Sequence, residues 1–180
     1  MKLAGPHIIS ALRENVQLEI GRHLYGVLGS YASVKRFEEI DLATARFLKG
    51  ESFPTPTNLN RSLLERIGDE DLRNLVQNEA RLPQTVQRRL NHEFDLLLQS
   101  LLQQSNFLIL KQIELLFAYN LDLHMIRARA TNQCHILLLL PGEKRGDHIT
   151  LFSEVNPRFH RTLPPQLITD THLWELADVE

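Results

Sequence analysis

The stretch Cys134-His135-Ile136-Leu137-Leu138-Leu139-Leu140 marks the point at which the chain changes character. It contains the longest uninterrupted aliphatic run in the sequence, and no polar residues break that run at helical spacing. A short continuous apolar run of this kind predicts a buried β-strand. It is much shorter than the roughly 20 residues that a helix needs to cross a bilayer. With a start that carries no secretory signal pattern, this indicates a cytoplasmic protein with no membrane association.

The residues on either side of this strand have a period of two. Ile126, Ala128 and Ala130 alternate with Arg127 and Arg129, which is typical of a half-exposed strand. After a glycine-containing loop at residues 141–147, a second alternation follows at 148–155, and an edge strand is expected at 158–163. The sequence therefore predicts a small antiparallel β meander over residues 123–163.

Before Leu121, apolar residues recur at helical spacing. We expect amphipathic helices at residues 6–28 and 33–49, two short helices at 58–79, and a long central segment at 83–120. The central segment has a wide apolar arc and a change of phase at Ser105 and Asn106, where a second helix could begin. The predicted fold is mainly α, a helical bundle around this long central helix, with a small C-terminal antiparallel β meander (α+β).

Three units follow from this pattern. They are a helical domain at residues 1–122, the β element at 123–163, and a C-terminal tail at 164–180. The tail is expected to hold a short helix that presents Leu173, Trp174 and Leu176.

Composition restricts the classes of protein that need to be considered. The chain has 180 residues, of which 43% are hydrophobic and 23% charged, and these values suit a globular domain that buries its own core. The single cysteine, Cys134, forms no intramolecular disulfide, in keeping with a reducing compartment. A net charge of −2 gives no overall attraction to nucleic acid or to anionic lipid.

Common catalytic and cofactor motifs are missing from the sequence. It has no Gly-x-Gly-x-x-Gly, no Gly-Lys-Ser/Thr and no Gly-x-Ser-x-Gly, and also no Cys-x-x-Cys or His-Glu-x-x-His. We therefore assign no catalytic residue, no cofactor and no metal site, and an enzymatic role is the less favoured interpretation.

Two short matches keep a hydrolase open as a third hypothesis. His148-Ile149-Thr150-Leu151 and His160-Arg161-Thr162-Leu163 fit a His-x-Thr-hydrophobic pattern that resembles the motif of two-histidine phosphoesterases. That resemblance implies an acid, a base and a phosphate site, but covers only these eight residues. In that family the two motifs lie far apart in sequence, whereas here they are close together.

The second match is the pair Arg129 and His135, which resembles the Arg-x(4–6)-His element of HEPN ribonucleases. The resemblance implies that Arg129 holds a phosphate and that His135 acts as an acid or base. In that family the element lies at the start of a helix, whereas here its residues are predicted to form strand, turn and strand.

The basic residues of the predicted β element are the candidate binding residues. Between His124 and Arg161 the basic side chains outnumber the acidic ones, and histidines and phenylalanines are interleaved with them. The expected binding residues are Arg127, Arg129, Lys144, Arg145, His148, Arg158, His160 and Arg161. We predict a non-enzymatic adaptor or assembly subunit, which uses its helical body for association with another protein or with itself as a homodimer. A nucleic-acid-binding protein is the alternative.

Overall fold

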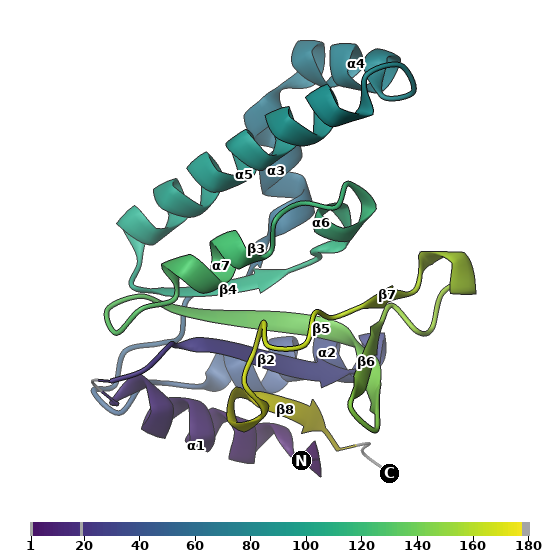
Figure 1. Ribbon diagram of the computed structural model, residues 1–180. Helices are drawn as coiled ribbons and strands as arrows, with labels where there is room; N and C mark the ends of the chain where they lie inside the picture. The colour runs from purple at the N-terminus through teal and green to yellow at the C-terminus, as the bar shows by residue number, and fades with distance from the viewer. Residues whose placement is uncertain (1, 19, 178–180) are drawn as a thin grey trace.

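A mostly parallel β-sheet between two layers of helices forms the body of the molecule (Figure 1). The computed structural model describes residues 2–18 and 20–177. Within them the central sheet has the strand order β1-β8-β2-β5-β4-β3, and all neighbours in it are parallel. Its strands are β1 (Lys2–Leu3), β2 (Leu24–Gly29), β3 (Thr57–Asn58), β4 (Phe107–Lys111), β5 (His135–Arg145) and β8 (Leu173–Leu176). The prediction of a helical bundle with a small antiparallel meander is therefore wrong.

The central strands β2 and β5 explain this error. They pair in register from Leu24 opposite Ile136 to Gly29 opposite Pro141, and every residue of β2 is buried. A parallel strand covered on both faces shows no alternation of polar and apolar residues. Leu24 and Leu28 of β2 therefore fit the four-residue spacing of apolar residues in the preceding helix, and the predicted helix was extended through the strand. That helix, α1 (Gly5–Val16), begins near the predicted point but ends well before the predicted boundary at residue 28.

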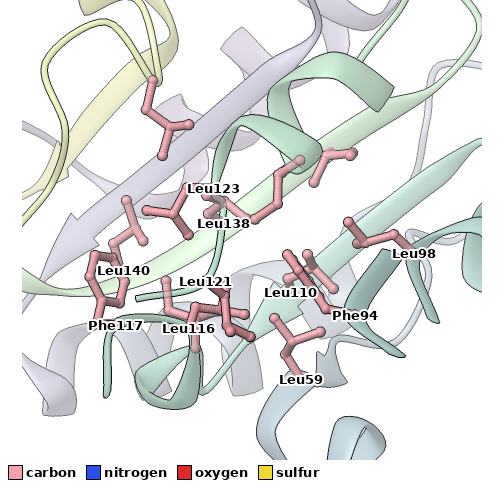
Figure 2. Close-up of a cluster of buried hydrophobic side chains, with 14 of the residues drawn as sticks. Leu59, Phe94, Leu98, Leu110, Leu116, Phe117, Leu121, Leu123, Leu138 and Leu140 are labelled. Atoms are coloured by element: carbon pink, nitrogen blue, oxygen red, sulfur yellow. The ribbon is translucent and has the colours of Figure 1, made fainter. Parts of the chain in front are cut away.

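The sheet has a separate apolar core on each face. On one face α1, α2 (Tyr31–Arg36) and the π-helical segment η1 (Phe37–Leu42) cover Tyr25, Val27 and Leu137. Figure 2 shows part of the other core, where side chains such as Leu110, Leu138 and Leu140 lie against helices. Those helices are α3 (Leu59–Ile67), α5 (Pro83–Gln104), α6 (Glu114–Ala118) and α7 (His124–Arg129).

The predicted long segment at 83–120 contains a strand. Its helix α5 begins at Pro83, as predicted, because proline suits the first helical turn. Ser105 then leaves the helical conformation, and its hydroxyl donates to the carbonyl oxygen of Phe107 at 2.7 Å. The chain continues as the buried strand β4, so the expectation of a second helix beginning at Ser105 or Asn106 is wrong.

Helices α3 and α5, with α4 (Asp69–Asn78), form an arm that extends away from the sheet (Figure 1). None of the residues of α4 is buried. The buried carboxylate of Glu93 on α5 joins the arm together, because it pairs with Arg66 of α3 at 2.9 Å and with Arg89 at 3.1 Å.

An antiparallel extension continues from β5 through β6 (His148–Leu151) to β7 (Arg161–Thr162). The buried strand predicted at residues 134–140 is confirmed. The alternation predicted at 148–155 forms a strand only at His148–Leu151, and the edge strand predicted at 158–163 is limited to Arg161–Thr162, because the chain turns at 152–155 and Pro157–Phe159 form a 3₁₀ turn. The strand predicted at residues 126–130 is wrong, because those residues belong to helix α7 and to the turn after it.

The tail also differs from the prediction. After two short 3₁₀ turns, η2 (Pro157–Phe159) and η3 (Asp170–His172), residues Leu173, Trp174 and Leu176 lie on strand β8 and not on a helix. The sheet thus combines strands from all three predicted units. None of the helices in the described ranges is both long and apolar enough to cross a membrane.

Candidate functional site

The connections between the strands lead to opposite sides of β2. A crevice is expected at the point where they diverge. From β2 the chain crosses to β3 and returns through β4 to β5 on one side, whereas β8 lies on the other side of β2. In doubly wound sheets, ligands bind outside the carboxyl ends of the strands at such a reversal. A cavity of about 330 Å³ lies at this edge, between the residues that follow β2, β4 and β6. We call it the carboxyl-edge pocket.

Four aromatic side chains line the pocket, those of Tyr31, Phe117, Phe152 and Phe159. The rings of Phe117 and Phe152 meet edge to face with centroids 5.7 Å apart. Phe152 is buried in a left-handed conformation with φ of 59°, which redirects the chain after β6 and turns the next residues toward α2.

Phe159 forms the exposed part of this wall. It is 47% exposed, and the guanidinium carbon of Arg158 lies 4.5 Å from the centre of its ring. This cation–π contact keeps a flat, amphipathic surface at the entrance to the pocket.

Two carboxylates lie near Tyr31 at the pocket. The backbone N–H of Tyr31 donates to Glu154 Oε1 at 2.9 Å. Glu114 accepts a hydrogen bond from the side-chain amide of Asn60 at 2.7 Å, which fixes the start of α6. Burial raises the pKa of the Tyr31 phenol, and the charges of Glu114 and Glu154 raise it further. The phenol therefore stays protonated and can donate a hydrogen bond.

Arg161 supplies the basic group of the pocket lining. One terminal nitrogen of its guanidinium donates to the carbonyl oxygens of Arg158 at 3.0 Å and His160 at 2.8 Å. His160 is held in turn by a 3.0 Å hydrogen bond between its Nε2 and the carbonyl oxygen of Val155. Internal hydrogen bonds therefore order the η2–β7 segment around the pocket.

The eight predicted binding residues fall into three groups. Arg161 lines the carboxyl-edge pocket, and Arg158 and His160 lie next to it on the same segment, where their carbonyl oxygens accept hydrogen bonds from Arg161. Lys144, Arg145 and His148 lie on the β5–β6 hairpin, where Lys144 pairs with Asp170 and Arg145 with Glu143. Arg127 and Arg129 lie on α7, and Arg129 pairs with Asp95 of α5 at 2.5 Å. Three of these cations are thus partly neutralised, and the eight residues are spread over separate elements.

The structure shows where the residues of the two hydrolase-like matches lie. Thr150 and Thr162 are opposite each other in the β6–β7 ladder, whereas His148 is opposite Arg145 and His160 is bonded to Val155. Arg129 ends helix α7, while His135 begins the buried strand β5.

A histidine cluster at the opposite, amino edge of the sheet was not expected from the sequence. The rings of His23 and His135 have centroids 4.3 Å apart, and His23 Nδ1 shares a 2.7 Å hydrogen bond with the hydroxyl of Tyr25. Burial lowers the pKa of His135 to about 4, helped by His23, and it also lowers the pKa values of His23 and His172. Within the described residues, however, no group of His, Cys, Asp or Glu is arranged to hold a metal ion.

Sequence reasoning missed three pocket residues, Tyr31, Glu114 and Phe117, and noted Phe152 only as an aromatic residue among the basic residues of the β element. Glu114 and Phe117 fall within the predicted helical segment at 83–120, and Tyr31 falls between the predicted helices at 6–28 and 33–49. A usable signal was the pair Gly29-Ser30 directly after an apolar run, because a strand followed by a small-residue turn and a helix is typical of α/β folds.

Comparison with known proteins finds no match for this chain among protein-family models, curated proteins or solved structures.

Proposed function

We propose that the chain is a protein-interaction subunit, an adaptor or assembly component, that holds an apolar side chain of its partner in the carboxyl-edge pocket. The observation that carries this proposal is the aromatic wall of Tyr31, Phe117, Phe152 and Phe159 at the edge where α/β sheets bind ligands. The cytoplasm is the compartment we propose for it.

The composition of the pocket supports a protein partner. Aromatic residues and arginine are enriched at the energetic centres of interfaces, where they surround pockets that exclude water. Phe159 and Val155 leave 47% and 39% of their surface exposed, and Arg158 stacks on Phe159. The volume of about 330 Å³ is at the low end of the range of roughly 300–1,000 Å³ for ligand sites. It therefore suits one large side chain.

The placement of the basic residues makes nucleic acid the weaker candidate. Lys144, Arg145 and Arg129 each pair with a carboxylate, which reduces the charge that a phosphate backbone would meet.

The test uses small analogues of aromatic side chains as probes. We expect indole and p-cresol to shift the methyl NMR signals of Ala118 and Val155, and Phe159→Ala to weaken the response severalfold. Leu48→Ala, at the other edge of the sheet, is the matched control and is expected to leave the response unchanged. Shifts spread over many methyl groups, or an equal response in Phe159→Ala, would count against the pocket.

A further inference from the structure

We propose that a groove at the amino edge of the sheet binds an extended, uncharged peptide segment of a partner protein. This surface is distinct from the carboxyl-edge pocket and lies at the other ends of the strands, on the left in Figure 1. It lies between the end of α1 and the loop at residues 47–54 on one side, and the residues around the starts of β4 and β5 on the other. Its volume is about 1140 Å³.

The size of the groove suits a chain segment better than a compact ligand. Small-molecule sites usually have volumes of about 300–1,000 Å³. This groove exceeds that range and lies between elements that are far apart in the sequence.

The chemistry of the lining matches a polypeptide backbone. Six carboxamide side chains line the groove, those of Gln17, Gln103, Gln104, Asn106, Asn132 and Gln133. A carboxamide offers both a donor and an acceptor, which is the pair of groups that each backbone peptide unit presents. Among the described residues, only Asn132 of these six uses its side chain in a hydrogen bond, accepting from the N–H of Gly21.

His135 is a buried polar residue of the groove lining. It lines the groove while only 7% exposed, and its Nδ1 has no hydrogen-bond partner among the described residues. That nitrogen is fully buried close to the ring of His23, so the polar contacts of a bound peptide come from the exposed carboxamides and not from this atom.

The charge of the lining argues for an uncharged segment. Arg13 and Lys49 are its basic residues and Glu51 is its acidic residue. Arg13 is already occupied, because its Nε donates to the carbonyl oxygen of Arg46 at 2.6 Å. Leu48 lies in the lining and is 63% exposed, which offers a contact for an apolar side chain of the segment.

Both walls are held by backbone contacts and so do not need to be ordered by the ligand. On one side the N–H of Phe47 donates to the carbonyl of Glu51 at 2.7 Å, and Arg46 bridges to Ser52. On the other side the N–H of His135 donates to the carbonyl of Asn106 at 2.8 Å. A preformed groove loses less conformational entropy when a peptide binds.

The test is selection of a phage-displayed library of random 12-residue peptides against the full chain, followed by affinity measurements on the synthetic peptides. We expect enriched peptides with few charged residues. The double variant Gln103→Ala with Gln133→Ala should weaken them by roughly tenfold or more, since each lost hydrogen bond contributes a factor of about two to ten. Both residues are exposed, so the variant should fold.

Phe159→Ala is the matched control, because it alters the carboxyl-edge pocket and leaves the groove intact. Three results would overturn the proposal: no enriched peptide, peptides that bind the double variant equally well, or peptides that lose affinity only in Phe159→Ala. Salt-sensitive binding of a (dT)₁₅ oligonucleotide that the double variant abolishes would instead assign the groove to nucleic acid.

Discussion

The carboxylate of Glu154 lies 2.9 Å from the backbone nitrogen of Tyr31 and accepts its hydrogen bond. This contact joins the segment after β6 to the start of α2, the two elements that contribute Phe152 and Tyr31 to the carboxyl-edge pocket. The negative charge also lies at the helix end where the backbone dipoles favour it. Glu154 therefore positions the pocket as well as stabilising the helix.

Glu154→Gln should show both effects. We expect the free energy of unfolding to fall by about 1 kcal/mol, since a charge-assisted hydrogen bond is replaced by a neutral one. The pKa of Tyr31 should move down toward its usual value, because one of the charges that raise it is removed. Ultraviolet titration of the tyrosines and denaturant unfolding measure these changes. Asp147→Asn, in the hairpin tip, is the control for loss of a carboxylate, and an equal effect there would refute the role of Glu154.

The histidines at the amino edge predict that acid destabilises the fold. The folded-state pKa of His135 is about 4 against 6.5 unfolded, so below pH 6.5 the unfolded chain binds a proton that the folded chain excludes. This contribution to stability is fully present above pH 6.5 and is lost as the pH falls toward 4. One pKa unit corresponds to about 1.4 kcal/mol, so His135 alone should lower stability by roughly 3 kcal/mol over this interval.

His135→Phe tests this assignment, because a phenyl ring preserves the stacking on Phe107 but cannot be protonated. Unfolding free energies measured between pH 4 and 7 should fall less steeply in this variant than in the wild type. His148→Phe, on the exposed start of β6, is the control. The same slope in His135→Phe and wild type would contradict the account.

The buried carboxylate of Glu93 should determine whether the helical arm stays assembled. It is 6% exposed and bonded to both Arg66 and Arg89. We expect Glu93→Ala to cost about 1–3 kcal/mol, less than for a fully buried pair because both arginines reach solvent. Hydrogen exchange should become faster in α3 and α5. Glu65→Ala, which removes an exposed ion pair with Arg61 in the same arm, should cost less than about 1 kcal/mol.

Gly142 is required at the base of the β5–β6 hairpin, where it lies opposite Leu151. A methyl group there would meet the backbone of Thr150 and would lie 2.9 Å from Leu151 Cα. Because backbone atoms cannot move aside as a flexible side chain can, Gly142→Ala should cost roughly 2 kcal/mol or more and disturb Phe152. Gly29→Ala meets only side-chain atoms at 3.2 Å or more and should cost less. Thermal unfolding of the two variants compares these losses.

The sequence predicted individual elements well where a local signal was strong. Pro83 marked the start of α5, and the run from Ile136 to Leu140 identified the central strand β5. The antiparallel step from β5 to β6 followed from the glycine-containing loop between them.

The fold class was wrong because parallel strands buried on both faces carry no period-two pattern. Tyr25-Gly26-Val27-Leu28 and Phe107-Leu108-Ile109-Leu110 are short apolar runs, and beside a helix such runs resemble its continuation. The aromatic and β-branched residues were the available evidence for strands, and Gly26 was evidence against a helix. The pocket could not be predicted either, since its residues meet only through the order of strands in the sheet.

Photo-crosslinking from the pocket in the protein's own cells is the most direct test of the proposed function. A benzophenone amino acid replaces Phe159 in one variant and the exposed Val76 of the helical arm in another. We predict a crosslink to one defined protein from position 159 that is absent from position 76 and is reduced by adding Phe117→Ala. A crosslink to nucleic acid, an equal yield from both positions, or no crosslink from position 159 would contradict a partner side chain in the pocket.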